Sequence, residues 1–394
     1  MKIDVYSPTI RRKEMDAVLT VMVENKIGPG GEAKLLIQTA RERLKFDQCL
    51  ALRSPAIALH LALKYLELKE GQGVVISALS PLYYSRVIED LGLTVIYCDV
   101  QASTVCMSRA SIEKSLVNLG EGVVAGCVVL HHTLGYLCDV ADIAELGIPI
   151  IEDCSQSYGS VIGRSEADES GEDDNSNGKA PIALDLAVGV HSSFTILGLE
   201  ECDMLTSGGG SLLFSAGRRS LKQREAAGAR SAWLPSDFPA ELGLPDLNAA
   251  LAVVQFREAN KNLVKRREIA RLYSQSVLRT RHKRFIQNDV ISANAQGFKP
   301  SNEDGEEKLP VLYNNYAFSL ILETGVKDVK AYAKRKDISV ESAFENTPIG
   351  NGTVLPKLCP EAYSLSLRTV LFPIYPRLGM ANAGRVAKLI QTLP

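Results

Sequence analysis

The stretch Ile150–Ser160 reads IIEDCSQSYGS and indicates the fold more clearly than any other part of the sequence. Two branched apolar residues lead into an acidic pair, which is typical of a buried parallel strand that ends at a ligand site. The last carboxylate, Asp153, would then point out of the sheet, where it could pair with a protonated pyridine nitrogen. The alternative is an ordinary strand end at which Asp153 caps the next turn.

Strand-like and helical patterns alternate along the first half of the chain. Branched apolar runs occur at 74–78, 95–99, 123–130 and 148–152, and segments with helical periodicity lie among them. Short strands joined by helices predict right-handed crossovers and a mostly parallel, doubly wound sheet.

The later part of the chain has a mixed pattern. Residues 246–273 indicate one long amphipathic helix or two. A strand-like segment at 315–322 and a helical one at 326–336 follow. We therefore expect a large α/β domain over residues 1–259 and a smaller C-terminal α+β domain over residues 260–394.

Two segments have the composition of insertions. Residues 164–179 (RSEADESGEDDNSNGK) contain no large apolar side chain, so they predict a mobile acidic surface loop. A metal or partner site is the alternative for this loop. Residues 287–308 are similar but less extreme.

The overall composition excludes several classes of protein. A net charge of −2 gives no reason to expect a nucleic-acid or membrane-surface partner. No apolar run reaches the roughly 18 residues that a membrane span needs. The eight cysteines form no CxxC pair, which predicts a reduced cytoplasmic protein without a zinc site or a disulfide framework.

Several motifs, in this order along the chain, resemble the DegT/StrS family of sugar-nucleotide aminotransferases, which use pyridoxal phosphate on the fold-type-I scaffold. Gly28 and Pro29 match an early GP turn, and SPAIALHLAL from Ser54 stands where members read SGTAALHLAL. The stretch IIEDCSQSYGS resembles viEDaAqahGa, and LRTVLFPIYPRL resembles the segment before the last helix. The resemblance covers almost the whole chain. It implies a fold-type-I large domain with a mostly parallel sheet, a smaller C-terminal domain and a homodimer.

The resemblance also implies roles for five residues toward pyridoxal phosphate. Asp153 would pair with the ring nitrogen, Gln156 would donate to the phenolic oxygen, and Ser193 would contact the phosphate, as would the segment that contains Ser54 and Ala56. For each of these residues the alternative is a polar or structural role in the local backbone.

The lysine on which the family's chemistry depends is missing. That lysine binds the cofactor covalently and moves a proton, which requires a neutral amine in a site of low dielectric constant. Counting from Phe194 puts Gly198 at its position, and counting back from Gly210 puts Cys202 there. No lysine lies between residues 179 and 222.

Other family contacts are also altered. Pro55 removes an N–H donor from the phosphate-binding helix start, and Glu241 aligns where it would repel a phosphate. The aromatic residue that stacks on the cofactor ring aligns with Pro81, and Tyr83 or Tyr84 could replace it only if the loop moved.

Three functions remain open. The chain could be a degenerate member of surface-polysaccharide or deoxyaminosugar synthesis that does not transaminate and serves as a binding or regulatory protein, with a nucleotide sugar as ligand or a paralogous aminotransferase as partner. It could be an active aminotransferase. It could also be a lysine-free enzyme such as a sugar dehydratase, with non-covalent pyridoxal phosphate and His191 as a base. His131 and His132 are expected in a surface loop or, alternatively, on the substrate side of the cleft.

Overall fold

The computed structural model describes residues 2–117, 119, 123–162, 189, 191–215, 238–285, 290–292, 308–323 and 325–394. Within these ranges, no helix combines the length and apolar character needed to cross a membrane. The acidic segment 164–179 lies outside the described residues, as does nearly all of 287–308, so the loops expected there stay predictions.

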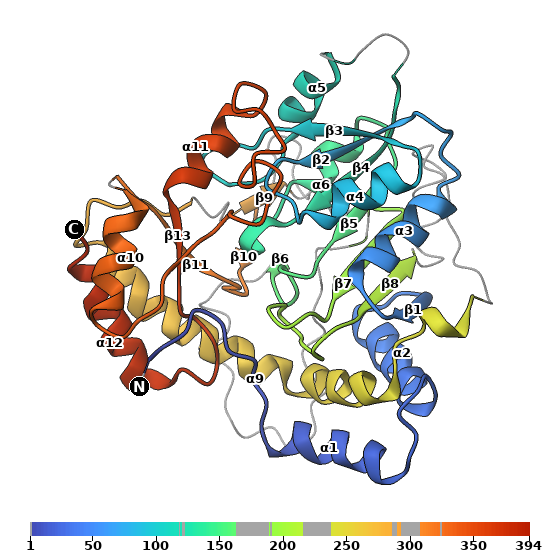
Figure 1. The fold of residues 1–394 in the computed structure, drawn as a ribbon, viewed down its shortest axis with the longest axis horizontal. Coiled ribbons are helices and arrows are strands. Elements are labelled where there is room, and N and C mark those ends of the chain that lie inside the picture. Colours follow the sequence, from blue (N-terminus) through green and yellow to red (C-terminus); the bar gives the residue numbers. More distant parts are fainter. Residues whose placement is uncertain are drawn as a thin grey trace.

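A seven-stranded sheet forms the centre of the larger part of the molecule (Figure 1). The strand order is β1-β8-β7-β5-β4-β2-β3. Only β8 runs antiparallel to its neighbours, which confirms the predicted mostly parallel sheet. The strands are β1 (Gln48–Leu52), β2 (Gly73–Ser77), β3 (Thr94–Cys98), β4 (Ala125–His131), β5 (Ile150–Asp153), β7 (Phe194–Gly198) and β8 (Ser211–Ser215).

Helices cover the sheet and connect its strands (Figure 1). The helix that follows β1 begins where the sequence predicts, because Ser54 Oγ accepts a hydrogen bond from Ile57 N and Pro55 occupies the first helical position. The helices are α1 (Arg12–Val23), α2 (Gly31–Leu44), α3 (Pro55–Tyr65), α4 (Tyr83–Asp90), α5 (Arg109–Val117), α6 (Val140–Ala144), α9 (Asp246–Val277), α10 (Val326–Lys334), α11 (Pro360–Arg368) and α12 (Gly379–Gln391), with short 3₁₀ turns η1 (Thr133–Gly135) and η2 (Ala240–Leu242).

Two smaller sheets accompany the central one. Their orders are β6-β10-β9 and β11-β13-β12, and all the pairings are antiparallel. The strands are β6 (Val161–Ile162), β9 (Val290–Ser292), β10 (Lys308–Leu312), β11 (Phe318–Ile321), β12 (Glu341–Ser342) and β13 (Thr369–Phe372).

The segment that could have formed one helix or two forms a single 32-residue helix, α9. It packs against α1 and α2 at one end and against α12 at the other. Asp246, at its start, accepts hydrogen bonds from Gly30 N and Ala33 N, and so caps the beginning of α2. The expected domain boundary at residue 259 therefore falls inside a continuous helix.

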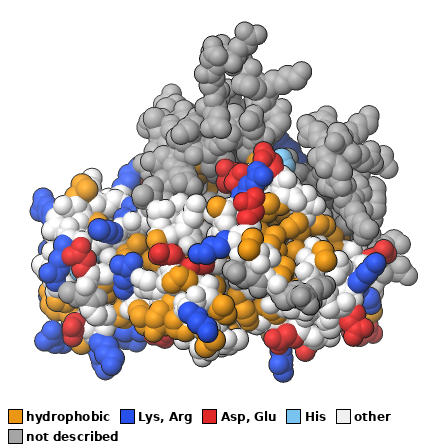
Figure 2. Space-filling model, turned by 90° about the horizontal axis from the view of Figure 1, so that it is seen from above, with side chains coloured by type: hydrophobic (Ala, Val, Ile, Leu, Met, Phe, Trp, Pro, Cys, Tyr) orange, Lys and Arg blue, Asp and Glu red, His pale blue; other side chains and the backbone are white. Residues whose placement is uncertain are grey.

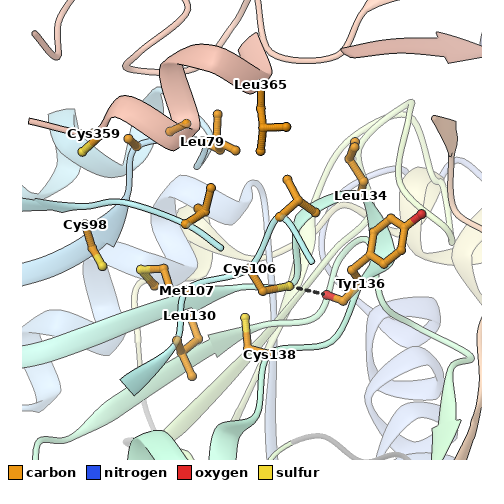
Figure 3. Close-up of a cluster of buried hydrophobic side chains, with 14 of the residues drawn as sticks. Leu79, Cys98, Cys106, Met107, Leu130, Leu134, Tyr136, Cys138, Cys359 and Leu365 are labelled. Carbon is orange, nitrogen blue, oxygen red and sulfur yellow. Dashed lines mark hydrogen bonds between the residues drawn. The ribbon is translucent and has the colours of Figure 1, made fainter. Parts of the chain in front are cut away.

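The core contains several free thiols among apolar side chains (Figure 3). Cys106 donates to Tyr136 O at 3.3 Å, and Cys138 lies nearby in the same cluster. Seven of the eight cysteines are buried and Cys202 is exposed. A buried thiol without a disulfide partner packs as a small apolar side chain.

Candidate functional site

The carboxyl ends of β4, β5 and β7 meet at one edge of the sheet because these strands are parallel. Asp153 is the last residue of β5, and the register pairs it with His131 in β4 and Ile196 in β7. Its carboxylate is 1% exposed. The sheet therefore places the acid that the sequence singled out at the edge where α/β folds bind ligands.

Both carboxylate oxygens of Asp153 accept hydrogen bonds from side chains of the same chain. Ser155 N donates to Oδ1 at 2.9 Å, and Ser155 Oγ donates to the same atom. Tyr84 Oη donates to Oδ2, and Tyr83 Oη lies 3.4 Å from that oxygen. Burial and the charge of Asp153 hold the pKa of Tyr84 well above its usual value, so the phenol keeps its proton and acts as a donor.

The space beside the end of β7 is filled by an acid. A Cβ atom on Gly198 would lie 2.3 Å from Asp203 Oδ2 and 2.7 Å from Ser155 Oγ. Gly198 N donates to Ser155 Oγ at 2.7 Å, and Glu200 N donates to Asp203 Oδ2 at 2.8 Å. Burial, and secondarily the charge of Asp153, raises the pKa of Asp203 to about 8. Asp203 is therefore mainly a neutral carboxylic acid at neutral pH.

The loop after β7 crosses the same edge. Met204 N donates to Ser155 O at 3.4 Å, which ties the loop to the segment that follows β5. Cys202, one of the two positions counted for the lysine, lies in this loop. Burial is the largest of the effects that raise the pKa of its thiol to about 11, so it stays protonated and is a poor nucleophile.

Two of the expected cofactor contacts lie at the other end of the sheet. Ser193 N donates to Ile150 O at 2.7 Å, which places Ser193 beside the start of β5. His191 precedes Ser193 in the chain, so the strand direction does not bring either residue to Asp153. The phosphate role of Ser193 and the base role of His191 stay predictions without geometric support.

The remaining expected contacts are used locally. Gln156 Oε1 accepts a hydrogen bond from Leu134 N at 2.7 Å. Ser54 caps α3, and its carbonyl oxygen accepts from Ser211 Oγ at 2.8 Å. Ala56 follows in the first turn of α3 and brings no hydroxyl group.

His131, at the end of β4, and His132, directly after it, are buried, so their expected place in a surface loop was wrong. His131 is 4% exposed and His132 is 1% exposed. His131 ends the buried strand β4, and its ring lies edge-on to Tyr84 with the ring centroids 6.1 Å apart. Burial lowers the pKa of His131 to about 4, so it is neutral at physiological pH.

His132 belongs to a buried hydrogen-bonded group. Cys138 N donates to its Nδ1 at 3.1 Å, so Nε2 carries the ring proton and donates to Glu152 Oε1 at 2.9 Å. Glu152 Oε2 accepts from Gly189 N at 2.7 Å. Ligand atoms of His132, Glu152 and Cys154 lie within 4.8 Å of one another, which is a spacing suited to a metal ion. Because Nε2 is already bonded to Glu152 and Nδ1 already accepts from Cys138 N, we interpret this group as a structural hydrogen-bond network.

Comparisons with known proteins all point to sugar aminotransferases. A family model described as the DegT/DnrJ/EryC1/StrS aminotransferase family matches residues 8–174. The chain is 23% identical to dTDP-4-dehydro-2,3,6-trideoxy-D-glucose 4-aminotransferase from Saccharopolyspora spinosa, over 99% of this chain and 96% of that protein. It is also 29% identical to GDP-perosamine synthase from Escherichia coli O157:H7, over 40% of this chain and 43% of that protein.

Solved structures share the whole fold. The putative sugar aminotransferase Spr1654 from Streptococcus pneumoniae, in its PMP-form, superposes with a TM-score of 0.76 at 16% identity, over 100% of this chain and 98% of that chain. The aminotransferase TlmJ from Streptoalloteichus hindustanus gives a TM-score of 0.74 at 18% identity, over 99% of this chain and 98% of that chain. The predicted fold class is confirmed.

Proposed function

Starting from the premise that this chain belongs to the DegT/DnrJ/EryC1/StrS aminotransferase family, we propose that it is a member that does not transaminate. In this proposal it serves surface-polysaccharide or deoxyaminosugar synthesis as a binding or regulatory protein. The names of two relatives, which refer to a dTDP-linked sugar and to GDP-perosamine, support a nucleotide sugar as its ligand class.

The environment of Gly198 is the observation that carries the proposal. The sequence has no lysine between residues 179 and 222. At the end of β7, the space that a side chain on Gly198 would need is taken by Asp203 Oδ2 and Ser155 Oγ. A carboxyl and a hydroxyl group cannot form the covalent link to a carbonyl cofactor that an amine forms.

The contacts of the other residues do not fit pyridoxal phosphate as the family motif would hold it. A ring nitrogen would have to replace Tyr84 Oη at Asp153 Oδ2, and Ser155 already engages Oδ1. At the start of α3, Pro55 offers no N–H group, while Ser54 Oγ is engaged as the helix cap. Each lost donor to an anion weakens binding by about 1.5–3 kcal/mol. These contacts favour weak, non-covalent binding of this cofactor.

Borohydride trapping tests the proposal. Purified protein is mixed with pyridoxal phosphate, reduced with borohydride and mapped by peptide mass spectrometry, in parallel with a transamination assay on nucleotide-sugar ketones. We expect no pyridoxyl adduct between residues 180 and 221 and no amino transfer. An adduct at Lys179 or Lys222, both outside the described residues, together with turnover would establish an active aminotransferase instead. Dehydration of the sugar without an adduct would establish the lysine-free enzyme.

Calorimetry provides an independent test of the cofactor contacts. We expect the unmodified protein to bind pyridoxal phosphate more weakly than the micromolar range. Binding in the micromolar range or tighter would contradict the interpretation that Tyr84, Ser155 and Pro55 have closed this site.

A further inference from the structure

A cleft lies between the N-terminal segment, the loop after β7, the middle of α9 and the segment after β13. It is narrow and opens to solvent. Residues 6–9, 201–206 and 374–376 line it together with Arg266 from α9. Asp203 closes one side, so the cleft adjoins the end of β7 without including Asp153.

One nitrogen atom of the Arg266 guanidinium donates hydrogen bonds to backbone carbonyl groups. Its Nη1 donates to Ile374 O at 2.7 Å, to Tyr316 O at 3.0 Å and to Asn315 O at 3.4 Å. Within the part of the chain that the structure describes, every hydrogen bond from this guanidinium leaves from Nη1, and no carboxylate forms an ion pair with it. The Nε–Nη2 edge therefore retains two N–H groups for a ligand.

The charge of Arg266 is poorly compensated. Burial lowers its pKa to about 10, and the groups that oppose this shift are the phenols of Tyr316 and Tyr6 rather than an acid. The guanidinium nevertheless stays protonated at neutral pH. A half-buried cation without a carboxylate partner is only partly compensated, so an anion that entered the cleft would be stabilised there.

The acids around the cleft limit the charge that it can accept. Asp203 is mainly neutral at pH 7 because its pKa is raised to about 8, whereas Glu201 is exposed. A single guanidinium beside Glu201 can balance one negative charge but not two. The two parallel N–H groups of the guanidinium match the two oxygen atoms of a planar carboxylate. A tetrahedral anion fits these N–H groups no better, so the charge limit favours a monocarboxylate.

We propose that this cleft binds a small monocarboxylate whose two oxygen atoms accept hydrogen bonds from Nε and Nη2 of Arg266. Such a site goes beyond the proposed function, because it is separate from the contacts of Asp153. It holds whether or not cofactor chemistry survives in this chain.

Calorimetric titration of the full chain with sodium acetate and sodium lactate, against sodium chloride at matched ionic strength, tests the site. We expect saturable binding of a carboxylate and weaker binding of inorganic phosphate. Arg266→Lys keeps the charge but loses the fork, so its carboxylate affinity should fall at least ten-fold. Arg12→Lys, a change on an exposed side chain, should bind like the wild type.

Cys202 provides a reporter for the same cleft, because it lines the cleft and is the one exposed thiol. Because the raised pKa makes this thiol slow to react at neutral pH, its alkylation by N-ethylmaleimide is followed at mildly alkaline pH by mass spectrometry on the wild-type protein, and bound carboxylate should slow it. This measurement decides the question even if Arg266→Lys fails to fold. No saturable binding, tighter binding of phosphate, undiminished affinity in a folded Arg266→Lys variant, or binding without protection of Cys202 would each overturn the proposal.

Discussion

Tyr84 donates its phenolic hydrogen to the carboxylate that the family motif reserves for the cofactor ring. The two groups are 69 residues apart in the chain and meet because α4 begins at the carboxyl edge of the sheet. The apolar run that becomes β5 was enough to identify Asp153 from the sequence. The sequence offered Tyr83 or Tyr84 only as a stacking residue, because the loop from β2 to α4 decides which tyrosine reaches the acid.

Replacing Tyr84 with phenylalanine should destabilise the protein. A hydrogen bond to a charged, buried acceptor contributes about 1.5–3 kcal/mol, so we expect the free energy of unfolding in urea to fall by about that amount. Tyr83→Phe is the matched control, because Tyr83 Oη lies 3.4 Å from the same oxygen and should matter less. Equal losses in the two variants would show that Tyr84 is not the principal donor.

Asp203 makes a pH-dependent contribution to the free energy of unfolding, which an asparagine at this position would not make. Its pKa of about 8 in the folded state exceeds the ordinary aspartate pKa of 3.8, so between those pH values the folded state keeps a proton that the unfolded state has released. The free energy of unfolding therefore decreases as the pH rises from about 4 to about 8.

In Asp203→Asn this decrease should be absent. Relative to the wild type, we expect the variant to gain at least about 1.4 kcal/mol of stability between pH 5 and pH 8, the equivalent of one pKa unit. Urea unfolding at both pH values measures the change. Parallel pH profiles for the two proteins would contradict an acid that is protonated in the fold.

At the scale of elements, β7 shows where sequence counting fails. The strand runs from Phe194 to Gly198, so the residues that reach the functional edge follow Gly198 instead of preceding Phe194. The two counts for the lysine position, forward from Phe194 to Gly198 and back from Gly210 to Cys202, differ by four residues. Counting residues between motifs does not show whether extra residues lie before or after the strand. The count therefore pointed to Ser193, which lies beside the start of β5, and gave no sign that Asp203 fills the space beside Gly198.

Adding a methyl group at Gly198 should disturb this edge. Gly198→Ala would bring a Cβ atom to 2.3 Å from Asp203 Oδ2, so we expect a loss of about 1–3 kcal/mol in the free energy of unfolding. Gly31→Ala is the control, since nothing lies within 4 Å of its new Cβ atom at the first residue of α2. Its stability should be unchanged or slightly higher. A neutral Gly198→Ala variant would mean that Asp203 moves aside freely.

Regular elements were the most predictable part of this molecule. Branched apolar runs marked β2 to β5 because parallel strands are buried on both faces. The cap at Ser54 marked α3, and the apolar period marked α9. The direction of β8 was not predictable, because an apolar run of this length carries no sign of whether its neighbours run with it or against it.

At the scale of the whole molecule, the family resemblance predicts a two-fold homodimer. The segment 233–247 is expected to approach the Asp153 cleft of the second subunit. Its described part runs along the chain's own β1, where Leu244 N donates to Ala51 O at 3.0 Å and Leu52 bridges Gly243. One face of the molecule carries broad areas of hydrophobic side chains among scattered charges (Figure 2).

Sedimentation at micromolar concentration should give the mass of a dimer. An obligate interface of this kind buries more than about 2,000 Å², which keeps subunits together at such concentrations. A monomer would contradict the homodimer. It would direct attention to a different chain, such as a paralogous aminotransferase, whose addition should then shift the sedimentation of both proteins.

The long helix α9 has a consequence for the order in which the protein can be made. α1 and α2 pack on α9, and Asp246 caps the start of α2. About 200 residues separate Leu44, the end of α2, from Asp246. At 5–20 residues per second, the ribosome needs on the order of 10–40 s to deliver them. The two N-terminal helices therefore emerge well before α9, so in nascent chains that stop before residue 246 both helices should lack this partner and α2 should keep only its packing on β1.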